Sequence, residues 1–419
     1  MKIPTGLTVT NGKLTLSYED KPENKFTLLL SKSIYGLRQS GQNWYSTLSN
    51  ILKRFGAVPT TEDQAFFTLP SALIVTVVDD LLVSMPTTQL LKDFEEHLIS
   101  EKIALKIKDQ PNFFTGCNIT TTNEGIYLNQ TQFITNTLLS FHMNLCNTAL
   151  YPHLGSFIQD IYSEAPLAKD FPYRNLIGSL IWICLSRLDI EHTVNVLSQF
   201  NSNPKVTHVA AAKHILRYLK GTKDLSLFFP YGDGSFALTT HCDSDFATDT
   251  QSRRSRYGSV TRLNGTPISW TSKLQHSIAT SSSDAEFFAI CEAAYRLLHI
   301  TKILHGIGVH LENEPPTLYN DNSSAIQSLL SENPNRRPSK KHVDVRFCKI
   351  RELIHDTKDF ELAHVSSSDN LADILTKPMI GNIFKVLRSK LLKQVPAPFV
   401  SREGACFHKV NSTNELFTT

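Results

Sequence analysis

A run of alternating residues that ends in a carboxylate constrains this chain most. Residues 236–242 alternate as in a half-buried β-strand, so Asp243 is expected at or near the exit of that strand. Two further β-rich runs follow, separated by Asn264-Gly265. Asn-Gly between such runs is the strongest short hairpin signal that a sequence offers. The pattern therefore predicts a strand that delivers Asp243, followed by a β-hairpin.

Three more acidic residues lie near the ends of predicted elements. Glu286 closes the sequence Ser-Asp-Ala-Glu, which is typical of a capping box at the start of a helix. Asp321 follows the short strand 316–320, and Asp373 comes after the strand 360–365. Carboxylates that converge repel one another and need a cation, and hard divalent ions such as Mg²⁺ prefer oxygen ligands. Two such ions about 3.5–4 Å apart can stabilise the attacking and leaving oxygens of a phosphodiester displacement.

The composition allows two or three domains and excludes some classes of function. With 419 residues and 41% apolar residues, the chain can build ordinary cores, and its net charge of +3 means that any nucleic-acid footprint must be local. The seven cysteines form no Cys-x-x-Cys pair, which disfavours a zinc site and a disulfide framework and indicates a reducing compartment. The N-terminus lacks the pattern of a signal peptide, and the apolar stretches are too short to span a bilayer, so we expect no membrane partner.

Six sequence pieces between residues 236 and 378 occur in series: CDSDFATDTQSRRSRYGSV, PISWTSKLQ, SSSDAEFFAICEA, YNDNSSAI, KHVDVRFCKIRE and DNLADILTKPM. They resemble the ribonuclease H domain of copia-type retrotransposon Pol polyproteins. The resemblance implies that the catalytic, metal-binding set is Asp243, Glu286, Asp321 and Asp373. It also implies two Mg²⁺ ions as cofactor, with Mn²⁺ as an alternative, and an RNA–DNA hybrid as substrate, whose RNA strand is cleaved.

A second group of motifs lies upstream. The sequence SKSIYGLRQSGQNWY resembles the copia-type reverse transcriptase motif KSLYGLKQS, and by analogy Gln39 would be nucleotide-binding; a plain loop leading into a helix is the alternative. Two apolar, β-rich runs flank Asp79 and Asp80, which predicts a hairpin with exposed carboxylates at its turn. This resembles the YVDD hairpin of reverse transcriptases, with Val77 at the aromatic position. The resemblance implies that both aspartates are catalytic metal ligands, and that an RNA template and a DNA strand are partners.

A third metal-binding aspartate is expected in reverse transcriptases, in a strand well before the YGL motif. Residues 1–31 offer no residue that resembles it, because Asp20 lies in a polar, loop-like stretch. We therefore expect half a polymerase metal site, and no DNA synthesis by this chain alone.

The resemblances predict an α/β and α+β fold in four parts. They are a partial reverse transcriptase palm (1–110), a helical thumb or connection region (111–235), a ribonuclease H-like domain with a mixed five-stranded sheet and helices (236–379), and a C-terminal tail (380–419). Within the connection region, Trp182, Arg187 and Asp189 could be mistaken for a site. We interpret them as core packing and helix capping.

A basic stretch separates the predicted Asp321 unit from the next helix. Residues 332–351 hold seven Lys or Arg residues against two acidic ones. Such a run is usually a solvated face. Beside a phosphodiester-cleaving site, however, it indicates binding of nucleic-acid phosphates independently of sequence. His364 falls inside a predicted strand and is interpreted as structural. The nucleic-acid-binding candidates are Arg336, Arg337, Lys340 and Lys341.

Two functions are consistent with these patterns. The first is a metal-dependent ribonuclease H fused to a partial reverse transcriptase, which the complete set of four acidic residues favours. The second is a non-catalytic nucleic-acid-binding remnant of a transposon Pol protein, which the missing palm aspartate favours. The family resemblance implies a cytoplasmic location, in virus-like particles, or a nuclear one. It also makes the remaining Pol segment and integrase candidate partners.

Overall fold

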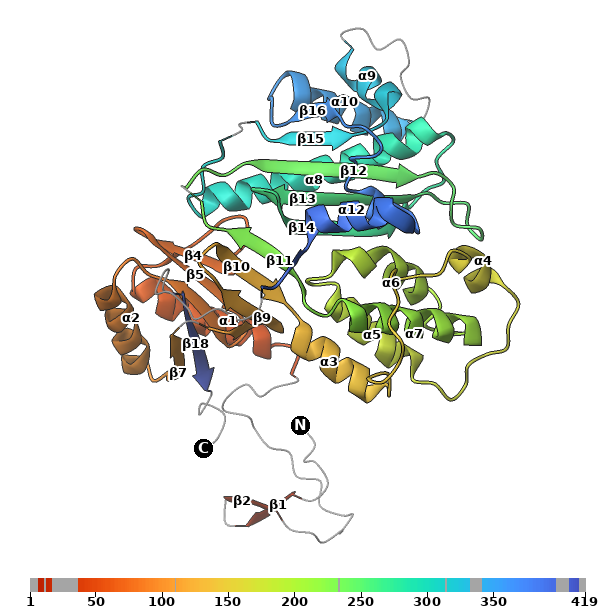
Figure 1. Ribbon diagram of the computed structural model, residues 1–419. Helices are drawn as coiled ribbons and strands as arrows, with labels where there is room; N and C mark the ends of the chain where they lie inside the picture. Colours follow the sequence, from red (N-terminus) through yellow and green to blue (C-terminus); the bar gives the residue numbers. More distant parts are fainter. Residues whose placement is uncertain are drawn as a thin grey trace. The chain divides into compact units, whose positions relative to one another are not determined.

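The computed structural model describes residues 37–109, 111–232, 234–312, 315–331 and 341–396, together with the strands Leu7–Thr10, Lys13–Leu16 and Phe407–Thr413. The chain forms two compact units, and Figure 1 labels many of their helices and strands. The first comprises residues 1–59, 67–108 and 409–419, and the second residues 60–66 and 109–408. Among the helices so described, none combines the length and apolar character needed to cross a bilayer. The predicted mixture of α/β and α+β architecture is confirmed, and the bounds of the four predicted parts stay predictions.

The first unit contains a six-stranded sheet and two amphipathic helices. Helix α1 (Ser40–Arg54) buries Leu48, Ile51 and Leu52 at helical spacing, and α2 (Thr88–Ser100) is capped by the Thr87 side chain, which accepts a hydrogen bond from the Leu90 backbone N–H. Both helices share one hydrophobic core with the strands. In sheet order the strands are β3 (Val58–Pro59), β4 (Phe66–Leu69), β5 (Ala72–Val77), β6 (Asp80–Ser84), β18 (Phe407–Thr413) and β7 (Ala104–Asp109).

One part of the second unit is a group of helices packed around an apolar core. The helices are α3 (Thr131–Ser140), α4 (Phe157–Tyr162), α5 (Tyr173–Ile183), α6 (Glu191–Ser198) and α7 (Val206–Gly221). A five-stranded sheet adjoins them, in the order β17 (Lys393–Gln394), β11 (Leu225–Pro230), β10 (Gly125–Asn129), β9 (Cys117–Thr121) and β8 (Phe113–Phe114). The helix α12 (Gly381–Leu391) joins this region, because its buried residues Phe384 and Leu387 belong to the same core.

Arg187 and Asp189 form an ion pair inside this core. The Arg187 Nη2 lies 2.7 Å from the Asp189 Oδ2, and both side chains are almost fully buried. The Tyr218 hydroxyl donates a further hydrogen bond to the same carboxylate, and Arg187 also donates to the Thr222 carbonyl. Burial alone would raise the pKa of Asp189, but the charge and hydrogen bonds of Arg187 hold that pKa below its usual value. Trp182, by contrast, is about half exposed.

The second five-stranded sheet of this unit is mixed, as predicted. Three antiparallel strands, β12, β13 and β14, are followed by two that run parallel to β12. Asn264 and Gly265 join β13 to β14 with positive φ angles of 48° and 80°, which a two-residue type I′ turn requires. In sheet order the strands are β14 (Thr266–Leu274), β13 (Arg256–Leu263), β12 (Leu238–Asp245), β15 (Thr317–Asn320) and β16 (Glu361–His364).

Strand β12 continues past the point at which the sequence pattern predicted its end. Asp243 pairs with Gly258, and Asp245 pairs with Arg256, so Asp243 lies within the strand, two residues before its end. The polar residues 243–245 look like a strand terminus in sequence, but β13 continues to pair with them. The prediction that the strand runs from 236 to 242 was therefore wrong by about two or three residues at each end.

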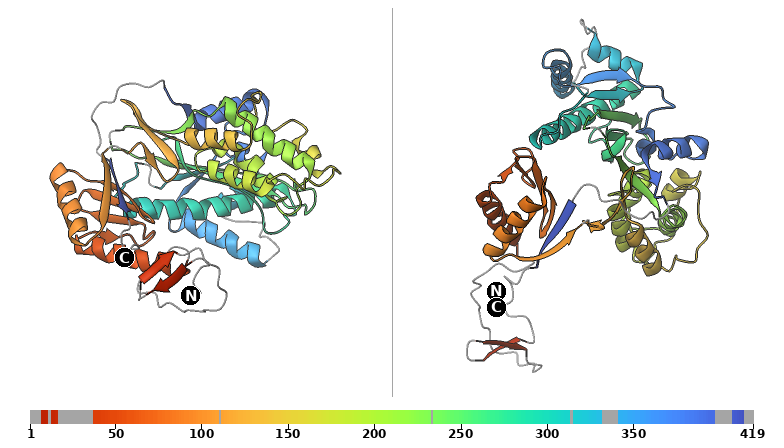
Figure 2. Two further views of the ribbon diagram at one scale, coloured as in Figure 1. Left: turned by 90° about the horizontal axis from the view of Figure 1, so that it is seen from below. Right: turned by 60° about the vertical axis from the view of Figure 1, so that its left-hand side comes forward.

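Helices cover this sheet from both sides. The long helix α8 (Ser282–Gly306) lies along β12 and β13 (Figure 2). The short helix α11 (Asp373–Thr376) also packs on β12, β13 and β14 but belongs to a different core, together with the helices α5, α6 and α7. Two further helices, α9 (Ser323–Leu330) and α10 (Lys341–His355), complete the unit. The cap of α8 is Ser281, whose side chain accepts from the Asp284 N–H, so the predicted capping box was two residues out of register.

Gly258 permits the close approach of α11 to the sheet. A Cβ atom added at this position would lie 2.8 Å from the Leu375 Cβ and 2.9 Å from the Thr376 Cγ2. Neither contact is with the far end of a flexible side chain, so the helix would have to move. Since Asp243 pairs with Gly258 across the sheet, the absence of a side chain here brings α11 beside Asp243.

Gly258→Ala is expected to destabilise the chain by about 1–3 kcal/mol, the usual cost of overpacking. Urea unfolding followed by circular dichroism measures the change. Gly178→Ala is the matched control, because Gly178 lies in α5 and an added Cβ there meets no atom within 4 Å. A Gly258→Ala variant as stable as the wild type would show that α11 does not depend on this contact.

Candidate metal centre

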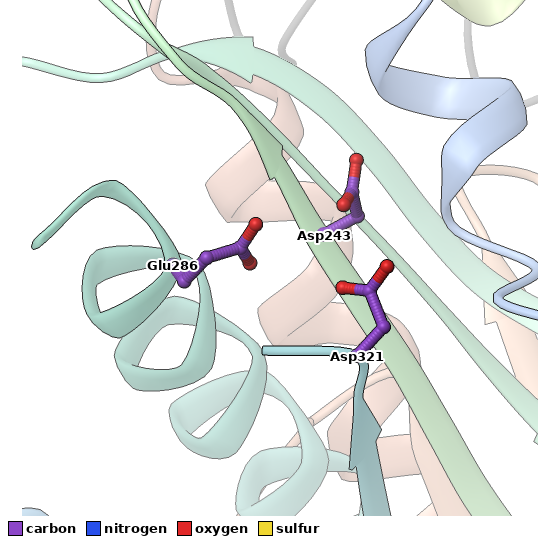
Figure 3. A group of neighbouring side chains, drawn as sticks. All are labelled: Asp243, Glu286 and Asp321. Carbon is purple, nitrogen blue, oxygen red and sulfur yellow. The ribbon is translucent and has the colours of Figure 1, made fainter. Parts of the chain in front are cut away.

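Three carboxylates converge at the carboxyl ends of two adjacent parallel strands. Asp243 lies in β12, Asp321 follows β15 directly, and Glu286 lies near the start of α8. The parallel register pairs His241 with Tyr319, so two residues further on Asp243 lies next to Asp321. One oxygen from each of the three carboxylates lies within 4.8 Å of the others (Figure 3). The structure thus brings together three of the four acidic residues predicted from the sequence.

Asp373, the fourth predicted residue, stands outside this group of three but beside it. It begins α11, and its Oδ1 lies 3.0 Å from the Nζ of Lys377. The same Nζ lies 3.3 Å from the Asp243 Oδ2, and the Thr376 hydroxyl also donates to Asp243. The ammonium group therefore connects Asp373 to the cluster.

Two buried asparagine side chains hold the centre in place. The Nδ2 atoms of Asn320 and Asn370 donate to the backbone carbonyl of Cys242, at 3.1 and 3.0 Å, which fixes β12 next to Asp243. Asn320 also donates to the Glu286 Oε2 at 3.0 Å. Both amide groups are fully buried. The loss of either amide would leave a buried carbonyl without one of its donors, which is costly.

These asparagines and Lys377 were missed by the sequence analysis. A local signal existed for the amides, because each precedes a predicted metal ligand within three residues in the sequences YNDN and DNLAD. Each Oδ1 accepts a hydrogen bond from a backbone N–H two residues ahead, at Asn322 and Ala372, which is the Asx-turn pattern. The long-range bonds to Cys242 carry no such local signal.

The electrostatics show a crowded acidic site. Burial, and then the charge of Asp243, raise the pKa of Glu286 to about 8 and that of Asp373 to about 7. Burial is also the main cause that raises the pKa of Asp245, on the same face of β12, to about 6. Burial would lower the pKa of Lys377, but the charges of Asp243 and Asp373 outweigh it and raise that pKa. Burial and the charge of Asp243 thus oppose the ionisation of Glu286 and Asp373.

The donor set suits a hard divalent cation. All the converging side-chain groups are carboxylate oxygens, which Mg²⁺ and Mn²⁺ accept readily, and mutual repulsion among them is what a cation would relieve. Asp243, Glu286 and Asp321 are the residues that could hold such an ion, and Lys377 connects Asp373 to this group.

The hairpin that resembles the YVDD motif of reverse transcriptases lies in the first unit. As predicted, β5 and β6 form a hairpin, in which Val77 pairs with Asp80. Asp79 and Asp80 are half-buried and not fully exposed. The Trp44 indole N–H donates to the Val78 carbonyl at 2.7 Å, which links the tryptophan of the upstream motif to the hairpin turn. Within the described residues, these aspartates belong to no group of three metal-ligating side chains.

Gln39 is exposed and occupies the N-cap position of α1 without a side-chain capping bond. His364 is exposed and lies at the end of β16, where it pairs with Asn320. Three predicted phosphate-binding residues, Arg336, Arg337 and Lys340, lie outside the described residues. Lys341 opens α10, and its side chain is outside the described part as well. These roles stay predictions.

Glu286→Gln is expected to stabilise the metal-free protein by a few kcal/mol at alkaline pH. Glu286 has a pKa raised from 4.5 to about 8 in the folded chain, so the folded state holds this proton more tightly than the unfolded state. Wild-type stability should therefore fall as pH rises from about 4.5 to about 8. The variant cannot ionise and should lack this loss.

Urea unfolding in EDTA at pH 5 and pH 8.5 measures this effect. Glu96→Gln, on the exposed side of α2, is the matched control and should follow the wild type. If the wild type and Glu286→Gln showed the same pH dependence, the repulsion inferred at Glu286 would be refuted.

Comparison with known proteins supports the motif-based assignment. The family model described as reverse transcriptase (RNA-dependent DNA polymerase) matches residues 15–155. The chain is 31% identical over 376 residues to the Retrovirus-related Pol polyprotein from transposon RE1 of Arabidopsis thaliana, covering 89% of this chain and 25% of that protein. It is 30% identical over 375 residues to the Retrovirus-related Pol polyprotein from transposon TNT 1-94 of Nicotiana tabacum, covering 86% and 28%.

Among solved structures, that of LC11-RNase H1 in complex with an RNA/DNA hybrid is similar at a TM-score of 0.25 and 16% identity, over 33% of this chain and 92% of that one. The chain spans about a quarter of the length of the curated relatives named above. With the reverse transcriptase match and the identity to transposon proteins over most of its length, the chain belongs to the family of copia-type retrotransposon Pol polyproteins.

Proposed function

We propose that this chain hydrolyses the RNA strand of RNA–DNA hybrids at the carboxylate centre, as a ribonuclease H. The observation that carries the proposal is the convergence of Asp243, Glu286 and Asp321, whose oxygens lie within 4.8 Å of one another. They meet at the carboxyl ends of parallel strands in a mixed five-stranded sheet, within a chain of the Pol family. Such a cluster is suited to metal-dependent phosphodiester cleavage.

Asp243, Glu286 and Asp321 would hold Mg²⁺, which when bound activates water and stabilises the leaving oxygen. A second ion would join when the hybrid is bound, and Mn²⁺ could replace Mg²⁺. The residues around the cluster orient its ligands. Asn320 fixes the Glu286 carboxylate through its 3.0 Å bond, and the Thr376 hydroxyl fixes that of Asp243. Precise orientation of metal ligands by such outer partners commonly accounts for 10- to 100-fold in activity.

The partners follow from the same proposal. The hybrid would be bound through its phosphates by the basic stretch that contains Arg336, Arg337, Lys340 and Lys341, independently of sequence. Other segments of Pol, including integrase, would be protein partners, in a cytoplasmic virus-like particle or in the nucleus.

Asp321→Asn is expected to reduce cleavage of an RNA–DNA hybrid at least about 100-fold, because it removes a charged metal ligand while keeping the shape of the side chain. The assay follows 5′-labelled RNA in a hybrid with Mg²⁺, using the full chain. The matched control is Asp93→Asn, an exposed residue of α2, which should cleave like the wild type.

Two results would contradict the ribonuclease H proposal. One is an Asp321→Asn variant that cleaves at the wild-type rate, which would also point to a contaminating nuclease. The other is a folded wild type that binds the hybrid without cleaving it in Mg²⁺ or Mn²⁺. That outcome would support the alternative, a non-catalytic nucleic-acid-binding protein.

We further propose that this chain alone does not synthesise DNA. Asp79 and Asp80 are joined by no third metal-ligating side chain in the part of the chain that the structure describes. Two carboxylate ligands would bind only weakly the metal ions that phosphoryl transfer requires. A primer-extension assay, with a complete copia-type reverse transcriptase as positive control, should yield no product, and processive synthesis by the purified chain would overturn this proposal.

A further inference from the structure

Lys377 places a positive charge between two acidic residues of the centre. Its Nζ lies 3.0 Å from the Asp373 Oδ1 and 3.3 Å from the Asp243 Oδ2. Both carboxylate side chains are almost fully buried, at 9% and 2% exposure, whereas the lysine side chain is 36% exposed. The ammonium group therefore reaches into the site from its rim and bridges carboxylates that would otherwise repel each other.

The backbone holds the lysine in this position. Its N–H donates to the Asp373 carbonyl at 3.1 Å, so the residue continues directly from the last turn of α11. The preceding residue, Thr376, is tied to Asp243 by its hydroxyl. Gly258 lets this whole segment approach the sheet. Two hydrogen bonds and the absence of a side chain at Gly258 thus direct the lysine toward Asp243 and Asp373.

A second divalent ion held between Asp243 and Asp373 would have to occupy the position of this ammonium group. A divalent ion shared by Asp243 and Asp373 would need the same carboxylate oxygens that the ammonium group contacts. Two cations at such short range repel strongly in a site with little water. An ion at the group of three would also have Glu286 and Asp321 as ligands. Among the described residues, neither of these two carboxylates forms an ion pair with Lys377.

We propose that the ammonium group of Lys377 takes the place of the second divalent cation while no nucleic acid is bound. The resting chain then holds one divalent ion, at Asp243, Glu286 and Asp321, and Lys377 neutralises the pair Asp243 and Asp373. This inference depends on the proposed function in one respect only, namely that a divalent ion binds at this centre. Lys377 is a positioning residue, and its removal opens a second ion site.

Counting bound Mn²⁺ ions tests this inference. The full chain, without nucleic acid, is titrated with Mn²⁺, and free Mn²⁺ is followed by electron paramagnetic resonance. The wild type should bind one ion per chain, and Lys377→Met should bind two. Lys377→Arg keeps the charge and should bind one. The matched control, Lys390→Met, removes an exposed lysine that pairs with Asp369 at 2.8 Å, and should also bind one.

A second variant keeps the inference testable if Lys377→Met does not fold, as circular dichroism would reveal. Asp373→Asn should still bind one ion, with an affinity within about threefold of the wild type, because the resting ion does not use Asp373. A wild type that binds two ions, a folded Lys377→Met that binds one, or an Asp373→Asn that loses its ion would each overturn the inference.

Hybrid cleavage by the same preparations separates this inference from the proposed function. If no preparation cleaves but the ion count changes from one to two in Lys377→Met, the ribonuclease H proposal fails and the role of Lys377 stands. If the wild type cleaves but binds two ions at rest, the proposed function stands and the role of Lys377 fails.

Discussion

Repulsion between converging carboxylates is the constraint on which the candidate metal centre depends. One carboxylate oxygen from each of Asp243, Glu286 and Asp321 lies within 4.8 Å of the others. Burial and the charge of Asp243 raise the pKa of Glu286 to about 8. Such an arrangement persists only if neighbouring groups compensate for it. Asn320 and Lys377 do so here, one through hydrogen bonds and the other through its charge. We therefore regard the stability and the chemistry of this region as two consequences of one cluster.

The fold brings these groups together through strand β12. Its neighbour β15 runs parallel to it and delivers Asp321, while its antiparallel neighbour β13 carries Gly258, which admits α11. Ile374 and Leu375 of α11 lie in the same hydrophobic core as the helices α5, α6 and α7. One face of the mixed five-stranded sheet thus packs on the helical region through α11 and Val260, so the tests of this centre need the full chain.

Local patterns in the sequence were sufficient to predict the Asn264-Gly265 hairpin and the β5–β6 hairpin, because turn residues and alternation act over a few positions. The mixed sheet was predicted only from the family resemblance. They misplaced the end of β12, since β13 continues to pair with the polar residues after Cys242. They also missed Asn370 and Lys377, whose bonds to Cys242 and Asp243 span more than a hundred residues. Contacts at that separation follow from the fold and leave no periodic signal.

The most direct test of the account is the position of a bound ion. A crystal of the full chain soaked in Mn²⁺ and measured at the manganese absorption edge would locate it by anomalous scattering. We expect a peak between the carboxylates of Asp243, Glu286 and Asp321, with oxygen ligands about 2.2 Å from the ion. A map with no peak there, or with those carboxylates turned apart into solvent, would contradict the claim that they form a metal centre.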